Sequence, residues 1–195
     1  ASKPAGEITP GDAVRMMIGR DISEMYPERR AVKGECVLNV NGLSSGTGLR
    51  DVSFSLHKGE ILGITGLLGA GRTELARALF GVDPVSGGRV TIGGNPAHLR
   101  SIPEAMAAGM GFVPEDRKHQ GLFLDKSVMW NISSTNIPSI SRRGMINRKR
   151  ERSFARKYTD TLDVRVSGLN QKVVNLSGGN QQKVVLAKWL ARNPR

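Results

Sequence analysis

Alternating apolar and polar positions mark the part of the chain that begins near residue 35. Apolar side chains recur at every second position over residues 36–40 and again over 52–56. A period of two is that of a strand with one buried face. The run ILGIT at residues 61–65 is instead uninterrupted, which is typical of a strand covered on both faces in a parallel sheet. The pattern therefore predicts two half-buried strands followed by one central strand.

Helical spacing appears directly after this central run and dominates the second half of the chain. TELARALF at residues 73–80 follows a glycine-rich loop and stops at a glycine. Phe154, Tyr158 and Leu162 recur at four-residue spacing, which places them on one face of a helix over about 147–163. The other expected elements are strands at 88–94 and 110–114 and helices at 103–110, 127–133 and 179–191. This order of strand, loop and helix predicts an α/β fold.

Composition describes a folded protein with a strongly basic balance. The chain has 195 residues, 38% of them hydrophobic, and a formal net charge of +12, which favours an anionic partner. Its longest apolar stretch is far shorter than the about 18 residues of a membrane-spanning helix. The single cysteine, Cys36, excludes an internal disulfide and indicates a reducing compartment, and we expect it to be a small buried strand residue. No secretory signal is visible, so we expect the cytoplasm.

The strongest local signal is the glycine-rich loop GLLGAGRT between the central strand and the first long helix. Its glycines let the backbone turn sharply and aim N–H groups at phosphate oxygens, beside the positive end of the helix. The basic side chain would reach phosphates, and the hydroxyl would help to hold Mg²⁺. The candidate nucleotide-binding residues are Gly66, Leu67, Leu68, Gly69, Ala70, Gly71, Arg72 and Thr73. The alternative is a strand-to-helix turn that binds no ligand.

Arg72 stands where this loop pattern has a lysine. Guanidinium is a wide planar fork, whereas lysine is a compact charge on a flexible stem. Arg72 can neutralise phosphate without reproducing the geometry that transfer requires. We therefore predict nucleotide binding with weak or absent turnover at this loop.

A second glycine corner stands at residues 175–183, in NLSGGNQQK. Ser177 can cap the helix that follows, and the two glycines let a phosphate approach unpaired backbone N–H groups. The residues of this motif are Leu176, Ser177, Gly178, Gly179, Asn180 and Gln181. The sequence therefore predicts a second anion-binding corner, 105 positions after Arg72.

The two corners together resemble the ATP-binding cassette family, whose signature LSGGQ is matched except that Asn180 replaces the glutamine. The spacing of the two motifs is typical of that family. FVPEDRKHQGL at residues 112–122 and MMIGRDISEMYP at 16–27 resemble, respectively, the second cassette of bacterial monosaccharide importer ATPases and the join that precedes it. That group serves ribose, galactose, arabinose, xylose and autoinducer-2. The resemblance covers essentially the whole chain, with an inter-cassette linker at 1–34 and a partial cassette at 35–195.

The resemblance implies a P-loop fold with a mixed sheet, an antiparallel strand subdomain near residues 35–60 and 88–94, and a helical subdomain from about 116 to 190. Two cassettes would face each other head to tail, with ATP held between the phosphate loop of one and the signature of the other. The partner cassette would be the first cassette of the same chain or a second copy. Mg²⁺ would be held by Thr73 and Glu115.

The resemblance also implies import of a monosaccharide at the cytoplasmic face of the bacterial inner membrane. Transmembrane permease subunits would dock on region 115–133, and a periplasmic sugar-binding protein would take part indirectly; no nucleic acid is expected. DKSVMWNIS at 125–133 looks like the family's S-V-x-x-N-I helix near the groove for a coupling helix. Met129 and Trp130 are candidate contacts, and core packing of that helix is the alternative.

The sequence departs from the family pattern in three places. Glu115 stands where a glutamine that reaches Mg²⁺ and the attacking water is usual, and the loop at 41–49 has no aromatic residue to stack on adenine. The Mg²⁺ aspartate, the catalytic glutamate and the switch histidine would be expected after Arg195. No catalytic set is therefore complete, and we predict no hydrolysis by these residues alone, since loss of a general base typically costs on the order of 10² to 10⁴ in rate.

Three functional hypotheses follow. The first is an ATPase cassette of a carbohydrate importer. The second is a non-catalytic half that presents LSGGN to a competent partner site. The third, a P-loop kinase, GTPase or nucleic-acid enzyme, predicts no role for residues 176–180.

A run of positive charge lies between residues 142 and 157, where eight basic side chains accompany one acid, Glu151. Three interpretations remain open at this stage. The run is a solvated helix face, a surface that attracts anionic lipid headgroups, or a nucleic-acid-binding segment.

Overall fold

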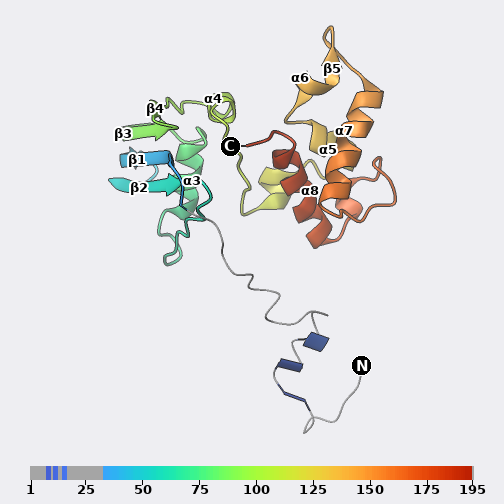
Figure 1. Ribbon diagram of the computed structural model, residues 1–195, viewed down its shortest axis with the longest axis horizontal. Coiled ribbons are helices and arrows are strands. Elements are labelled where there is room, and N and C mark those ends of the chain that lie inside the picture. The colour runs from blue at the N-terminus through green and yellow to red at the C-terminus, as the bar shows by residue number, and fades with distance from the viewer. Residues whose placement is uncertain (1–7, 10, 13–14, 17–32, 195) are drawn as a thin grey trace.

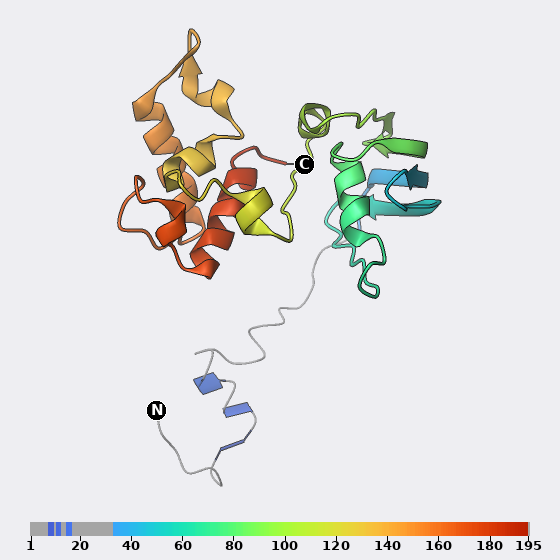
Figure 2. The same cartoon turned by 180° about the vertical axis from the view of Figure 1, so that it is seen from behind.

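The structure, a computed structural model, describes residues 8–9, 11–12, 15–16 and 33–194. Most of the linker expected at 1–34 lies outside the described residues; within it, residues 11–12 and 15–16 are helical. Figures 1 and 2 show two lobes, one built on a sheet and one helical, with the last described residues of the chain between them. Each lobe has its own hydrophobic core, and Trp189 packs against both. Its ring meets the edge of Phe80 at 5.3 Å between centroids.

The sheet lobe is an antiparallel sheet in the order β2-β1-β3-β4. Its strands are β1 (Cys36–Ser45), β2 (Val52–His57), β3 (Val85–Ile92) and β4 (Asn95–Pro96). Val40 of β1 lies opposite Phe54 of β2 and Val90 of β3, so apolar side chains meet across three strands. The antiparallel subdomain expected from the sequence is confirmed. Cys36 was expected to be buried, but it is exposed because it opens the strand.

Helix α3 (Arg72–Leu79) covers the sheet with Leu75, Ala78 and Leu79. In the last turn of this helix, Arg77 donates two hydrogen bonds to the carboxylate of Asp83, at 2.8 and 2.7 Å. These bonds hold the pKa of Asp83 below its ordinary value. The turn that follows α3 is thereby tied to the helix that carries the end of the glycine-rich loop.

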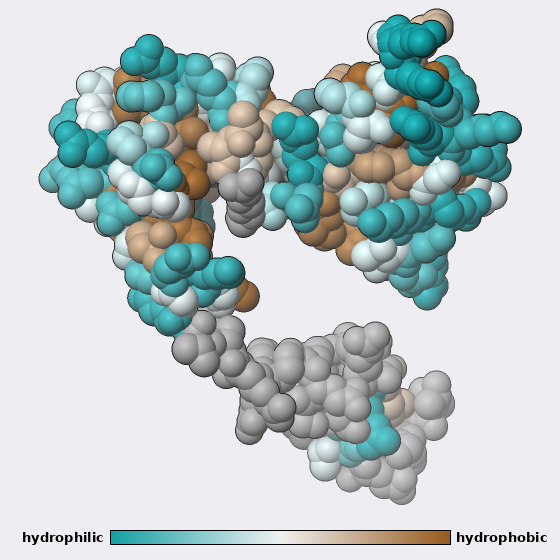
Figure 3. Space-filling view, turned by 45° about the horizontal axis from the view of Figure 1, so that its top comes forward, coloured by the Kyte–Doolittle hydropathy of each residue, from teal (hydrophilic) through white to brown (hydrophobic). Residues whose placement is uncertain are grey.

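The helical lobe is confirmed from residue 117 onward. Its helices are η2 (Arg117–Gly121), α5 (Val128–Ser133), α6 (Ile137–Ile140), α7 (Arg148–Thr161), η3 (Val173–Asn175) and α8 (Gly178–Leu190), with a hairpin of β5 (Ser141–Arg142) and β6 (Met145–Ile146). Helix α4 (Ile102–Ala107) precedes it. Buried Val128, Ile132, Val184 and Val185 place α5 and α8 in one core. Hydrophilic side chains cover much of the outer side of this lobe (Figure 3).

Two expected strands are not formed. Residues 61–65 and 110–114 have no strand assignment, and Ile61 is 82% exposed. An extended segment becomes a strand only when a neighbour pairs its N–H and C=O groups. Among the described residues, neither segment has such a neighbour. The apolar run at 61–65 therefore remains an open chain, and the prediction of a strand covered on both faces is wrong for these residues.

Candidate functional site

The glycine-rich loop leads directly into α3, as its sequence predicts. Gly71 is the residue before the helix and has a φ of 81°, in the left-handed region that favours glycine. No side chain caps the helix, so its first N–H groups face outward with the positive end of the helix dipole. Leu67 and Leu68 are exposed and cover nothing in the described chain. The loop is therefore exposed and leads into a helix end that no side chain caps.

Two adjoining hollows lie beside this corner. The first, of about 360 Å³, is lined by Thr73, Glu115, Asp116, Arg117, Lys118 and Gln120. The second, of about 470 Å³, is lined by Arg72, Thr73, Ala76, Phe112, Val113, Pro114, Glu115 and Gln182. Thr73 and Glu115, the two residues proposed to hold a metal, line both. The fold therefore brings the end of the glycine-rich loop next to residues 114–117, the PEDR segment of the sequence.

The donors in these hollows suit a phosphate group with its magnesium ion. A threonine hydroxyl and a carboxylate are hard oxygen ligands, and Mg²⁺ usually takes only one or two protein ligands besides water and substrate phosphates. Among the described residues, no group of three or more His, Cys, Asp or Glu side chains gathers to form a complete metal site. Arg117 adds a buried Nε with no hydrogen-bond partner in this part of the chain. An anion bound in the first hollow would be a partner of opposite charge for the Arg117 guanidinium group.

The LSGGN corner is built with two buried anchors and three exposed residues. Leu176 and Gln181 are buried, and Gln181 donates from Nε2 to the carbonyl of Val173 at 3.1 Å. Ser177 begins α8, and its Oγ accepts from the backbone N–H of Asn180 at 3.4 Å and from Asn180 Nδ2 at 3.0 Å.

The exposed residues of the corner are Ser177, Gly178 and Gly179. Asn180 is held on both sides, because its Oδ1 also accepts from the N–H of Arg165 at 2.9 Å. The part of the motif that is free to meet a ligand is therefore Ser177 to Gly179.

The two corners do not share a hollow. Residues 176–181 line neither of the two hollows beside the phosphate loop, and α8 reaches them only through Gln182. Arg117, which lines the first hollow, also lies close to the LSGGN motif, because a Cβ added to Gly178 would lie 2.8 Å from Arg117 Nη2. Of the signature residues, none therefore lines the two hollows beside the glycine-rich loop.

Sequence reasoning missed Lys188, which joins α8 to the end of η2. Lys188 is 7% exposed, and its Nζ donates to the carbonyl of Gly121, the last residue of η2, at 2.7 Å. Burial lowers the pKa of this lysine. The signal was present in the sequence, because Lys188 interrupts the apolar face of a helix next to Ala187 and Ala191. Its role is to hold η2, and with it Arg117, against α8.

Replacement of Lys188 by alanine is expected to lower the free energy of unfolding by about 1–3 kcal/mol, because the Gly121 carbonyl loses its donor. Urea unfolding of Lys188→Ala and wild type measures the difference. Lys183→Ala is the matched control on the same helix, since Lys183 is exposed to solvent at its Nζ contact with Asp163. Equal losses in the two variants would contradict the role assigned to Lys188.

These features are those of an α/β protein of the P-loop class. The family model for the ABC transporter matches residues 49–195, and the chain belongs to this family. The ribose import ATP-binding protein RbsA 3 of Rubrobacter xylanophilus is 46% identical over 195 residues, which are 100% of this chain and 39% of that protein. RbsA 2 of Streptomyces coelicolor is also 46% identical, over 100% of this chain and 37% of its own length. The chain thus spans well under half of these relatives.

Solved structures agree on the fold. The ATP-binding cassette MJ1267 in its ADP conformation superposes with a TM-score of 0.63 at 21% identity, over 82% of this chain and 66% of its own. A bacterial Atm1-family ABC exporter with ATP bound gives a TM-score of 0.59 at 24% identity, over 87% of this chain and 30% of its own. The P-loop fold with its strand and helical subdomains is therefore confirmed. No helix among the described residues is long and apolar enough to cross a membrane.

Proposed function

We propose that the chain is part of an ATPase subunit that couples ATP binding and hydrolysis to the import of a monosaccharide across the bacterial inner membrane. The observation that carries the proposal is the meeting of Arg72, Thr73 and Glu115 at one hollow beside an uncapped helix end. The resemblance to ribose import proteins supports the sugar class. Residues 1–34 would link two cassettes, residues 35–195 would form most of one, and the assembled subunit would lie at the cytoplasmic face.

Each residue of the site has a distinct part in this proposal. The backbone of residues 66–71 and the N-terminus of α3 would bind the phosphates of ATP, while Arg72 neutralises their charge. Thr73 and Glu115 would hold Mg²⁺, which when bound screens the phosphate charge and orients the reacting group. Ser177, Gly178 and Gly179 would contact ATP on the partner cassette. Closure around nucleotide would then bias the permease between two states.

The two residues expected to contact the permease, Met129 and Trp130, differ in their exposure to solvent. Met129 packs against the helical core, so of the two candidate contacts it is the structural one. Trp130 is 36% exposed and stands edge to face with exposed Phe123, at 4.7 Å between centroids. We propose this aromatic pair as the permease contact within region 115–133, with the periplasmic sugar-binding protein engaging the permease from the other side.

Nucleotide titration of the full-length protein tests the site. Arg72→Ala is expected to weaken binding of a fluorescent ATP analogue by about tenfold or more, because a charge-assisted contact is lost. Thr73→Ala should reduce the dependence of binding on magnesium. Arg50→Ala, an exposed arginine of the same lobe, is the control and should bind as wild type. An unchanged affinity in Arg72→Ala would contradict the assignment of the loop.

A second function is favoured by one observation, the arginine at the lysine position of the loop. In this alternative the chain is a non-catalytic half that presents LSGGN to a competent partner site. Arg72→Ala would then leave transport by the full-length protein unchanged, whereas substitution in the signature would abolish it.

A further inference from the structure

The positive charge of the run 142–157 lies entirely on the surface. All eight basic side chains of this run are exposed: Arg142, Arg143, Arg148, Lys149, Arg150, Arg152, Arg156 and Lys157. We call these eight residues the basic face. Its single acid, Glu151, is 1% exposed. Solvent therefore meets a surface with no negative charge between residues 142 and 157.

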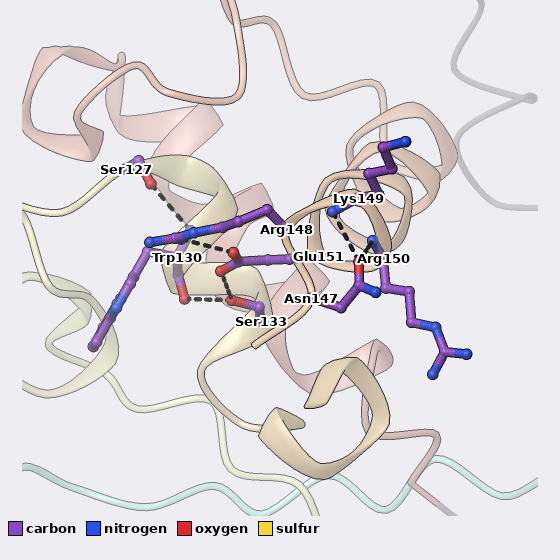
Figure 4. Close-up of polar contacts among 8 residues, drawn as sticks. All are labelled: Ser127, Trp130, Ser133, Asn147, Arg148, Lys149, Arg150 and Glu151. Carbon is purple, nitrogen blue, oxygen red and sulfur yellow. Dashed lines mark hydrogen bonds and ion pairs between the residues drawn. The ribbon is translucent and has the colours of Figure 1, made fainter. Parts of the chain in front are cut away.

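Glu151 is directed into the helical lobe, as Figure 4 shows. Ser133 of α5 donates from Oγ to Glu151 Oε1 at 2.9 Å, and Arg148 donates from Nη1 to Oε2 at the same distance. The carboxylate therefore neutralises one arginine and fastens α7 to α5. The other seven cations of the basic face have no acid within their own segment.

Three of these cations stand where a helix disfavours them. Arg148, Lys149 and Arg150 form the first turn of α7, and Asn147 caps it by accepting from the N–H groups of Lys149 and Arg150, both at 3.1 Å. The N-terminus of a helix carries a partial positive charge, so basic side chains there repel it. An anionic partner at this end would reduce the repulsion between these cations and the helix end, and also the repulsion among the cations themselves.

Three of the six cations of α7 form an exposed row. Lys149, Arg152 and Arg156 are spaced by three and four residues and so lie on one face. That row borders the side of α7 on which Glu151, Ala155 and Thr159 are buried. The positive charge of α7 thus includes a continuous exposed row along the helix.

The hairpin before α7 adds apolar side chains to the same end of the lobe. Figure 1 shows β5 and β6 projecting beyond α6 and the start of α7. Met145 is 72% exposed and Ile146 is 40% exposed, and one glycine separates them from Arg142 and Arg143. Apolar tips flanked by arginines suit the interface of a bilayer, where the alkyl groups enter the headgroup layer and the cations meet phosphate. Nucleic acids offer no such apolar layer.

We propose that the basic face and the Met145–Ile146 tip bind the anionic phospholipid headgroups of a bilayer. The charges and exposures carry this inference, and the proposed function contributes only a membrane close to the protein. The contact needs no nucleotide. A failure here would therefore leave the ATP site untouched, and a failure of the ATP site would leave this contact standing.

Vesicle flotation of the full-length protein tests the proposal. The probes are vesicles of equal parts phosphatidylglycerol and phosphatidylcholine and vesicles of phosphatidylcholine alone, without nucleotide. The quadruple variant Arg143→Ser, Lys149→Ser, Arg152→Ser, Arg156→Ser is expected to bind the anionic vesicles at least about 100-fold more weakly. Met145→Ser should lower the binding that remains when added salt screens the charges.

A charge-matched variant separates local from overall charge. Arg50→Ser, Lys58→Ser, Arg89→Ser, Arg100→Ser removes the same charge from exposed positions of the sheet lobe and is expected to keep vesicle binding within a few-fold of wild type. Equal losses in both quadruple variants, or equal binding to neutral vesicles, would overturn the proposal. Displacement of the vesicles by polyuridylate that binds more tightly through the same four residues would also overturn it, in favour of a nucleic-acid surface.

Discussion

Replacement of Ser177 by arginine is expected to abolish ATP-driven transport by the full-length protein while leaving nucleotide binding at its own phosphate loop intact. Ser177 is exposed at the start of α8, so the fold can accommodate a long side chain there. The arginine would fill the volume in which the phosphates of a partner-bound ATP meet Ser177 to Gly179. Loss of such a preorganised anion contact is expected to cost at least about 100-fold in turnover.

Two controls distinguish the ligand contact from the helix cap. Ser177→Ala removes the hydroxyl that accepts from Asn180 but adds no bulk, so its main cost is about 1 kcal/mol of stability. Val174→Arg places the same side chain at an exposed position just before the motif and should transport as wild type. ATP hydrolysis and sugar uptake in reconstituted vesicles are the measurements. Normal turnover in Ser177→Arg would refute the signature role.

The pair Ser177→Arg and Arg72→Ala also decides among the three functional hypotheses. An ATPase cassette that uses both corners loses turnover in both variants. A half that only presents LSGGN loses it in Ser177→Arg alone. A P-loop enzyme that works without a partner cassette would lose it in Arg72→Ala alone.

Elements with a local periodic signal were predictable from the sequence. The alternation in β1 and β2 and the four-residue spacing in α7 reflect which side chains face a core that lies within the described chain. The run at 61–65 has an equally clear pattern, yet it forms no strand. Its pattern describes burial between neighbours on both sides, and pairing depends on those neighbours as well as on the run itself.

Part of the candidate site was likewise predictable from the sequence, and part was not. The glycine loop and LSGGN were recognisable because each is a short motif whose backbone chemistry is complete within a few residues. The contact of Lys188 with Gly121 spans 67 positions, and that of Arg117 with Gly178 also joins distant segments. Such contacts depend on how η2 packs on α8, which no local pattern specifies. The burial of the Glu151 side chain was not predicted for the same reason, because it depends on a hydrogen bond from Ser133 on another helix.

Gly88→Ala is expected to destabilise the sheet lobe by about 3 kcal/mol or more, since strain and overpacking act together. Gly88 has a φ of 97°, and a Cβ there would lie 2.6 Å from the carbonyl oxygen of Gly42 and 2.7 Å from the Cα of Leu43. Both contacts are with backbone, so no side chain can rotate away. Because β1 and β3 meet at this point, the strands must separate to admit the methyl group.

Gly94→Ala separates the two causes. Gly94 has a φ of 80°, but nothing lies within 4 Å of its added Cβ, so only the backbone strain of about 1–2 kcal/mol applies. Urea unfolding of the two variants and wild type gives the difference that is due to the close approach of β1 and β3. Equal losses of stability in Gly88→Ala and Gly94→Ala would mean that the backbones of β1 and β3 lie farther apart at Gly88 than in the structure. A larger loss in Gly88→Ala measures the cost of separating β1 and β3 where Gly88 approaches the backbone of Gly42 and Leu43.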